Sequence, residues 1–343
     1  MCRYRQRKTG IMLVLLLILL ARICSAQGNT ITIIGGGDVM LGGPWESQVA
    51  QDGYRYPFKQ VSSLLQKADL SFVNLEAPLT IRGTEFVGKT YRFRVNPNAA
   101  KALKQSGITT VTLANNHSMD YGALGLADTL QHLRQAGVDA VGAGMNRAEA
   151  RRIQFYTVRG TTVALLGYSL TLPQEFWATN ARPGTAALHE VDVREDIAAA
   201  RKRAAIVIVA VHWGAEGSTV LREYQPRLAH MMIDAGADVI LGHHPHILQG
   251  MERYKQGLIF YSLGNFAFAS KSRIATRTML VRLRFEGKKR LAELIPLTID
   301  HRRVGFQPTP LSGTGADELI RAVELLPPAT VRVTRDGGYT IPF

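Results

Sequence analysis

The chain has 343 residues, of which 46% are hydrophobic and 20% are charged. This balance is that of an ordinary globular protein, so intrinsic disorder is not expected. The formal net charge of +14 favours anionic partners such as phosphate esters, lipid headgroups or polycarboxylates. The alternative is a basic surface that only aids solubility. The sequence contains no nucleic-acid recognition motif, and we expect no nucleic acid as partner.

The N-terminus has the three-part pattern of a secretion signal. Basic residues at positions 3–8 precede an apolar run over 11–20, and Cys24-Ser25-Ala26 supplies small residues before a cleavage point. The apolar run is short for a transmembrane helix. We expect residues 1–26 to be a signal peptide cleaved after Ala26, with export across the inner membrane to the periplasm or the outside. The alternative is an uncleaved membrane anchor.

Cleavage would also change the composition of the mature chain. It removes five basic residues, which lowers the formal net charge from +14 to +9. It also removes Cys2 and Cys24, the two cysteines of the sequence. The mature chain would therefore remain basic and contain no disulfide, although an exported protein could form one.

Short β-branched runs alternate with helical stretches through most of the chain, which predicts an α/β layered fold. We expect a main domain over residues 27–300 and a C-terminal extension over 301–343 packed on it. Strands are predicted over 30–34, 70–73, 108–113, 162–166, 206–211 and 239–241, and helices over 57–67, 97–105, 123–135, 193–204 and 222–235. From residue 257 the pattern predicts consecutive antiparallel strands over 258–262, 278–285 and 291–299, then a helix over 313–326. Residues 170–190 form one long irregular loop, which is either a binding loop or a surface excursion.

Chemically reactive side chains follow the ends of the predicted strands, where ligands bind in α/β sheets. They are Asp38, Glu76, Asn116, His117, His212, His244 and His246. Each one alone has a structural alternative. Asp38 could cap a turn after three glycines, and Asn116 with His117 could form the turn before a helix. His212 could be an ordinary packed histidine.

The segment Gly242-His243-His244-Pro245-His246 places three imidazoles within four residues. Such a cluster is costly to pack and suits a transition metal. Mixed oxygen and nitrogen ligands favour one or two ions of Mn, Zn or Fe, because Mg alone prefers more oxygen. We expect His244 and His246 to be ligands and His243 to be a structural neighbour.

A two-metal site needs a bridging carboxylate, further ligands on each ion and a proton donor for the leaving group. Glu76 could bridge the two ions, and His117 could remain unligated as general acid. The remaining ligands divide into Asp38 with His246 and Asn116 with His212 and His244.

A basic and aromatic stretch over residues 89–94 precedes Asn96-Pro97. If this stretch is a strand, Arg92 and Arg94 lie on one face and could grip carboxylates or phosphates. The alternative is an exposed strand whose basic residues prevent edge pairing. The predicted substrate-binding residues are Lys89, Arg92, Arg94, Asn74 and Asn265.

Seven short motifs occur in an order that resembles the CapA/PgsA family of poly-γ-glutamate capsule synthesis. They are GDVML at 37–41, NLE at 74–76, NNH at 115–117, DYG at 120–122, HWG at 212–214, GHHPH at 242–246 and SLGNF at 262–266. Each motif alone is weak, whereas their common order over residues 31–268 is specific.

The resemblance implies a calcineurin-like metallophosphoesterase fold, a four-layer α-β-β-α sandwich. It also implies a role in the synthesis, export or anchoring of poly-γ-glutamate. From the ligand set and the unligated His117 we expect a metal-dependent hydrolase or transferase site, and from the basic charge an anionic polymer and membrane synthase subunits as partners. The wider superfamily has a histidine ligand two positions after the first aspartate, where this chain has Met40, and an aspartate where it has Glu76. These departures leave a one-metal site, an altered two-metal site and a pure binding site open.

Two other functions compete with that interpretation. The first is a non-catalytic accessory subunit that binds the anionic polymer and couples it to a membrane synthase. The second is a general secreted metallophosphoesterase.

Overall fold

The computed structural model describes residues 30–323, 325–326 and 330–343. The predicted signal peptide lies outside these residues, and its cleavage stays a prediction. Among the residues described, no helix is long and apolar enough to cross a membrane.

Two sheets form the centre of the molecule. The first has the strand order β18 (Arg332–Val333), β19 (Tyr339–Pro342), β15 (Lys289–Thr298), β14 (Arg277–Glu286), β1 (Ile31–Met40), β2 (Leu70–Leu75), β3 (Thr110–Thr112) and β4 (Asp139–Val141), with β13 (Asn265–Phe268) beside β1 and β16 (Thr309–Pro310) beside β15. The second has the order β17 (Leu325–Leu326), β11 (Met251–Tyr254), β12 (Gly257–Phe260), β10 (Val239–His243), β9 (Ile206–His212), β7 (Thr161–Ser169) and β6 (Gln154–Val158). A small ladder joins β5 (Ala143–Gly144) and β8 (Gly184–Thr185).

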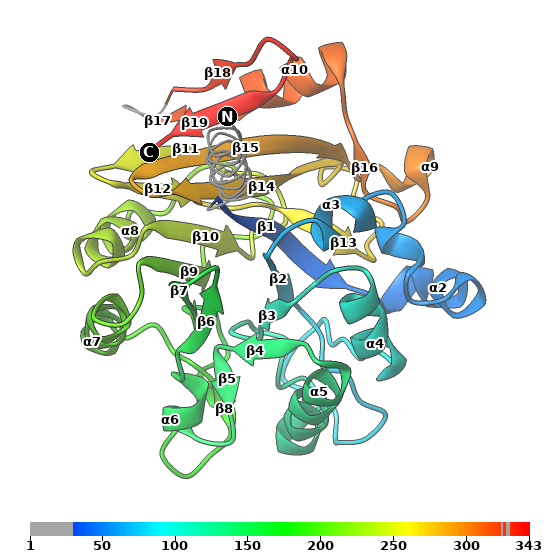
Figure 1. Ribbon diagram of the computed structural model, residues 1–343. Helices are drawn as coiled ribbons and strands as arrows, with labels where there is room; N and C mark the ends of the chain where they lie inside the picture. The colour runs from blue at the N-terminus through cyan, green and yellow to red at the C-terminus, as the bar shows by residue number, and fades with distance from the viewer. Residues whose placement is uncertain (1–29, 324, 327–329) are drawn as a thin grey trace, which may run out of the picture.

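Helices cover the outer faces of the two sheets (Figure 1). Those after β1, β2 and β3 are α2 (Glu46–Asp52), α3 (Ser62–Gln66), α4 (Asn98–Gln105) and α5 (Gly122–Ala136). The later ones are α6 (Arg147–Ala150), α7 (Glu190–Arg201), α8 (Tyr224–Asp234) and α9 (His301–Val304), whereas α10 (Gly313–Ala322) packs against the core between the sheets. Single 3-10 turns are η1 (Gly43–Trp45), η2 (Tyr56–Phe58) and η3 (Gln174–Phe176).

Alternating side chains of the strands divide the core into layers. Ile33 of β1 packs between the two sheets, whereas Ile34 packs under the helices beside the first sheet. In the second sheet, Ile208 faces the first sheet and Val209 packs toward α7 and α8. The period of two along a strand therefore supplies one core between the sheets and one beneath each helical layer. The predicted four-layer α-β-β-α sandwich is confirmed.

Most of the predicted strands and helices before residue 257 are present, and the differences have local reasons. Helix α5 ends at Gly137, whose φ of +73° is the left-handed C-terminal conformation that glycine favours. The predicted helix over 57–67 is wrong in extent, because the segment divides into η2 and the short α3. Strand β1 continues to Met40 through three glycines, where a bulge between Gly35 and Asp38 shifts the pairing with β2.

The prediction of consecutive antiparallel strands after residue 257 is wrong in part. Of the three predicted strands, only the last two pair in this way, β14 with β15, while β12 joins the other sheet parallel to β10. The predicted helix over 313–326 ends earlier, at Ala322. Residues 301–343 add β19 to the first sheet and β17 to the second, and Leu319 of α10 enters the core between the sheets.

A close backbone approach joins β1 to the segment that leads into β13. The Asp38 amide donates to Gly264 O at 2.9 Å, and a Cβ on Gly37 would lie 1.9 Å from the same oxygen. Glycine is required at position 37 because any side chain would force the two segments apart.

We predict that Gly37→Ala lowers the free energy of unfolding by about 1–3 kcal/mol or more, because the new methyl group overlaps backbone atoms that cannot rotate away. Urea denaturation of the mature chain would measure this change. The control is Gly315→Ala in α10, where the new Cβ meets only Leu311 at 3.5 Å and alanine favours the helix by up to about 1 kcal/mol. Equal unfolding free energies for Gly37→Ala and the unsubstituted chain would contradict the argument.

Candidate metal centre

Parallel strands bring the predicted site residues to one edge. Asp38 of β1 lies in register with Asn74 of β2 on one side and with Asn265 of β13 on the other. In the second sheet, His212 of β9 lies in register with His243 of β10. Because the strands of each pair run in the same direction, their carboxyl ends carry these polar side chains together.

The structure groups the predicted ligands into two sets that share Glu76. Glu76, His212 and His244 present donor atoms within 4.8 Å of one another, and so do Asp38, Glu76 and His246. Asn116 joins the first set, since its Oδ1 lies 2.8 Å from His212 Nε2. One or two ions could be held by these sets, with Glu76 as their shared carboxylate, and the role of each residue as a ligand stays a prediction.

Two of these residues have strained backbones. His244 has a φ of +98° and His246 a φ of +62°, a region that residues with a side chain rarely adopt. Each such residue costs about 1–3 kcal/mol and persists only where the surrounding structure holds it. Here Asn265 N donates to His246 O at 3.2 Å, and Gly217 N donates to Pro245 O at 2.9 Å. Strain concentrated on the two half-buried imidazoles of the cluster favours a functional reason for their positions.

The two buried carboxylates have opposite pKa shifts. Burial opposes the ionisation of Asp38, but hydrogen bonds and charges from His243 and His246 outweigh it and hold the pKa of Asp38 well below its usual value. Burial raises the pKa of Glu76 well above its usual value, and the charge of His246 only partly counteracts it. Burial also acts on His246, but Glu76 and Asp38 raise its pKa to about 9.

The other two imidazoles of the donor sets are held neutral. Burial lowers the pKa of His244 to about 3, with the neighbouring His246 as a second cause. Burial likewise holds the pKa of His212 well below its usual value, with His244 as a second cause. A neutral imidazole has the free nitrogen lone pair that a metal ion binds.

Two polar atoms of the donor sets are buried without a partner in the described part of the chain, which bears on whether these residues fit a metal. Glu76 Oε1 and His244 Nδ1 are buried and have no hydrogen-bond partner among the described residues. Buried polar atoms in folded proteins are nearly always paired, so each exception needs an explanation. A divalent cation would satisfy the carboxylate oxygen and compensate the charge of two buried carboxylates. The donors are oxygen and imidazole nitrogen, which suits Mn, Zn or Fe.

His117 lies beside the ligand sets and pairs with an aspartate. Its Nδ1 is 2.6 Å from Asp120 Oδ2, and its ring packs 4.2 Å from the ring of Phe93. Burial lowers the pKa of His117, whereas Asp120 opposes the shift. With Nδ1–H donated to Asp120, Nε2 is the ring nitrogen that can exchange a proton with a substrate. We had assigned Asp120 no role from the sequence, where its position three residues after His117 was the available signal.

Lys89 is half-buried against the same loop. Its Nζ lies 2.7 Å from Asp120 Oδ1 and also contacts Asn116 O and His117 Nδ1. Burial lowers the pKa of Lys89, and Asp120 counteracts the shift. The ammonium group is thus engaged within the protein and holds Asp120 in place. Its predicted contact with substrate is not tested by these distances.

The predicted substrate-binding asparagines contact the ligand residues. Asn74 Nδ2 donates to Asp38 Oδ1 at 2.8 Å and to Glu76 Oε2 at 3.2 Å. Asn115, which the sequence analysis assigned no role, donates to Asn74 Oδ1 at 2.9 Å and so fixes the amide. Asn265 Oδ1 lies 2.9 Å from His246 Nδ1. Both amides orient the candidate ligands, and binding of substrate by them stays a prediction.

Met40 and His243 belong to neither donor set. Met40 is buried in the core, and its sulfur accepts from Gly42 N at 3.3 Å. His243, which we expected to be a structural neighbour, is also buried, with Nδ1 3.2 Å from Asp38 Oδ1. The imidazole of His243 therefore contacts the carboxylate of Asp38 from the second sheet.

The expected strand over residues 89–94 is absent, and with it the shared face of Arg92 and Arg94. Arg92 Nε lies 2.8 Å from Glu85 Oε1. Arg94 lies over the ring of Tyr121, 4.6 Å from its centroid. The segment is irregular because its hydrogen bonds go to side chains and loops, such as Phe93 N to Asp120 Oδ2 at 2.8 Å.

Comparison with known proteins gives consistent matches to capsule proteins. The family model described as "Bacterial capsule synthesis protein PGA_cap" matches residues 32–270. "Capsule biosynthesis protein CapA" of Bacillus anthracis is 36% identical over 249 residues, 71% of this chain and 61% of that protein. "PGA biosynthesis protein CapA" of Bacillus subtilis (strain 168) is 37% identical over 234 residues, 68% of this chain and 62% of that protein. This chain thus matches about three fifths of the length of these relatives.

A more distant relative has a related name. A "Probable polyglutamine synthesis accessory protein" of Mycobacterium tuberculosis is 30% identical over 281 residues, 69% of this chain and 74% of that protein. Among solved structures, a hypothetical protein from Thermus thermophilus has a TM-score of 0.49 at 17% identity, covering 78% of this chain and 98% of its own. The NAD nucleotidase of Haemophilus influenzae has a TM-score of 0.48 at 14% identity, covering 87% and 64%. Likenesses at this level say nothing about a shared activity.

We predict that Mn²⁺ or Zn²⁺ raises the melting temperature of the mature chain and that Glu76→Gln abolishes the shift, because both donor sets lose their shared carboxylate. Free metal at about 100 times its dissociation constant would add about 2.7 kcal/mol to the free energy of unfolding. Differential scanning fluorimetry and metal analysis would measure both effects.

The matched control is Glu252→Gln. Glu252 is also a buried carboxylate, but it pairs with His230 and Tyr261 at 2.8 and 2.6 Å, away from both donor sets. This variant should keep the metal-dependent shift even if its basal melting temperature falls. The metal centre would be disproved if the unsubstituted protein bound neither ion.

Proposed function

We propose a function from one premise: this chain belongs to the family of bacterial capsule synthesis proteins described as PGA_cap. The proposed activity is metal-dependent hydrolysis or group transfer on poly-γ-glutamate or on a phosphoester. It would occur in an exported protein that acts in synthesis, export or anchoring of the capsule polymer, together with membrane synthase subunits. The observation that supports this proposal most is the His117–Asp120 pair next to two donor sets that share Glu76.

The residues of the chain have separable tasks in this proposal. Asp38, Glu76, His244 and His246, with Asn116 and His212, would hold one or two ions of Mn, Zn or Fe. A bound ion of this kind supplies Lewis-acid polarisation of the scissile group and a water of lowered pKa. Asn74 and Asn115 keep the carboxylates oriented through amide hydrogen bonds.

Proton transfer to the leaving group is assigned to His117. As the bond to the leaving oxygen or nitrogen breaks, His117 Nε2 would donate a proton, and the positive charge of the ring is balanced by Asp120 at Nδ1. Lys89 acts through Asp120, since its ammonium group fixes the second carboxylate oxygen. Lys89 is in this respect a positioning residue.

We predict that His117→Ala lowers kcat by about 10²–10⁴-fold on the best substrate while the metal content is unchanged, because the proton donor is lost and the ligands remain. Asp120→Asn should cause a smaller loss, because the ring keeps its place without its counter-charge. Hydrolysis of poly-γ-glutamate and of phosphate diesters, measured by release of new ends or of phenolate, would test this.

The control for this series is His230→Ala, a histidine that pairs with Glu252 outside the site. It should leave turnover unchanged. Unaltered turnover in His117→Ala would overturn the assigned role, and metal-loaded protein without turnover on either substrate class would overturn the catalytic proposal.

The second candidate function is a non-catalytic accessory subunit that binds the anionic polymer. Two observations favour it: the formal net charge of +9 after the expected cleavage, and a relative whose name describes an accessory protein. This function needs no turnover. A general secreted metallophosphoesterase is a third candidate, which would hydrolyse simple phosphate monoesters.

We predict for the accessory function that poly-γ-glutamate binds at low salt, that its affinity falls steeply as salt rises, and that His117→Ala binds as tightly as the unsubstituted protein. The reason is that exposed charges are screened over about 10 Å at 0.1 M salt. Isothermal titration at several salt concentrations would measure the affinities. Absence of binding at low salt would exclude this candidate.

A further inference from the structure

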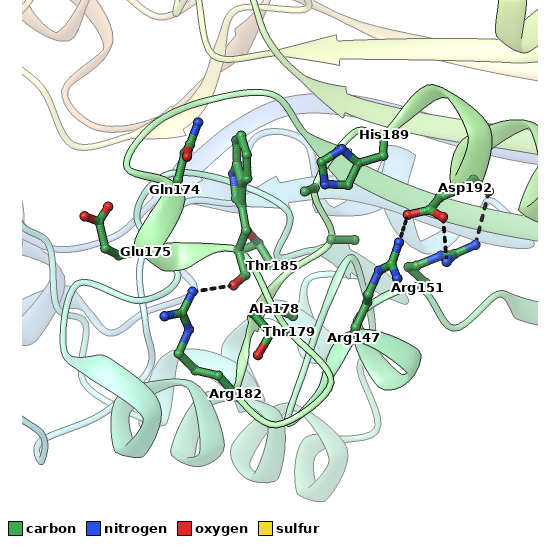
Figure 2. A pocket seen from close by; sticks show the side chains of 13 residues that line it. Arg147, Arg151, Gln174, Glu175, Ala178, Thr179, Arg182, Thr185, His189 and Asp192 are labelled. Atoms are coloured by element: carbon green, nitrogen blue, oxygen red, sulfur yellow. Dashed lines mark hydrogen bonds and ion pairs between the residues drawn. The ribbon is translucent and has the colours of Figure 1, made fainter.

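A second polar pocket, of about 390 Å³, lies outside the metal centre (Figure 2). Its walls come from α6, the first turn of α7 and the long loop between β7 and α7. The side chains that give it chemical character are Arg147, Arg151, Arg182, Trp177, His189 and Asp192. None of them belongs to the metal centre, and the proposed mechanism uses none of them.

The three arginines differ in their partners. Arg147 and Arg151 converge on the buried carboxylate of Asp192, with Arg151 Nη1 at 3.0 Å from Oδ1, and this pairing fixes both guanidinium groups at the pocket wall. Arg182 has no carboxylate within ion-pair distance among the described residues. Its side chain makes one long hydrogen bond there, Nη2 to Trp177 O at 3.4 Å. Arg182 can therefore bind an external anion with little loss of internal contacts.

Two rings provide flat apolar surface beside these charges. The indole of Trp177 is held by its Nε1, which donates to Thr171 O at 3.1 Å, so the ring keeps one orientation. The imidazole of His189 stands edge-on to it, with 6.0 Å between ring centroids. A rigid aromatic face next to an unpaired guanidinium suits a ligand that joins a planar group to a carboxylate.

The same loop connects this pocket to the metal centre. Leu170 N donates to His212 O at 2.9 Å at the start of the loop. Phe176, between the pocket residues Glu175 and Trp177, packs against Phe86 at 4.9 Å, and its ring lies 5.2 Å from Lys89 Nζ. The pocket and the His117–Asp120 pair thus lie on either side of one packed segment.

We propose that this pocket is a second binding site for a γ-linked polycarboxylate chain, separate from the reaction centre. Arg182 binds a carboxylate of the chain, and the indole of Trp177 packs against an adjacent peptide plane. Such a chain carries both planar amides and carboxylates, and the pocket offers both aromatic and basic side chains. The identity of the ligand rests on the proposed function.

The test uses the mature chain, a short synthetic oligo-γ-glutamate and its neutral γ-glutamine counterpart. Isothermal titration should show binding of the carboxylate chain only, and Arg182→Gln should weaken it about tenfold, as expected for loss of a charge-assisted hydrogen bond. Arg194→Gln is the matched control, because Arg194 is exposed on the same helix α7 and does not line the pocket. This control should bind like the unsubstituted chain.

Spectra of the tryptophan side chains locate the site independently of affinity. The chain has three tryptophans, and the indole N–H signal that disappears in Trp177→Phe should be the one that shifts on addition of the oligomer. Equal affinity of Arg182→Gln and the unsubstituted chain, or a Trp177 signal that does not move, would overturn the proposal. The variant Glu76→Gln distinguishes the proposed catalytic function from the second binding site. It should lose turnover but keep the shift of the Trp177 signal. Loss of this shift in Glu76→Gln would place the oligomer at the metal centre alone.

Discussion

Two fully buried carboxylates, Asp38 and Glu76, impose the main constraint on this molecule. Taking carboxylates out of water is unfavourable unless positive charge and hydrogen bonds compensate them. Asn74 reaches both of them, and His246 lies between them with its pKa raised to about 9. One oxygen of Glu76 nevertheless has no hydrogen-bond partner among the described residues. A bound cation would satisfy this oxygen and compensate the two carboxylates.

Strained or crowded backbone at neighbouring residues accompanies the close approach of Asp38, Glu76 and the imidazoles. His244 and His246 adopt positive φ values, and Gly37 approaches Gly264 so closely that a side chain would not fit. Both features lie where the first sheet meets the loops of the second. The extensive core between the sheets, with Ile33 and Leu241 among its members, supplies the stabilisation that such strain needs. The positions of the site residues therefore depend on the packing of both sheets.

Family membership and site geometry inform different parts of the function. The match over residues 32–270 assigns the chain to capsule synthesis proteins, whereas the position of His117 between Asp120 and the donor sets concerns chemistry. Asp120 holds the ring of His117, and Lys89 contacts the other oxygen of Asp120; the proposed proton transfer rests on this arrangement. The basic surface and the pocket around Arg182 agree with an anionic polymer as the molecule that both functions would share.

Local sequence pattern by itself determined much of this protein. Hydrophobic periodicity located most strands before residue 257, and the carboxyl ends of those strands indicated Asp38, His212 and His246 as site residues. Asp38 and His212 lie in different sheets, so only the packing of the two sheets brings them together. Only the tertiary structure decided what depends on contacts between distant segments. In the folded chain Lys89 contacts Asp120, Arg92 contacts Glu85, and Arg94 packs on the ring of Tyr121. Arg92 and Arg94 therefore do not share one face. The tertiary structure also decided that β12 lies in the second sheet and that a pocket forms around Arg182. Strand partners and the directions of loop side chains depend on packing between distant segments, and no periodic pattern in the sequence reports this packing.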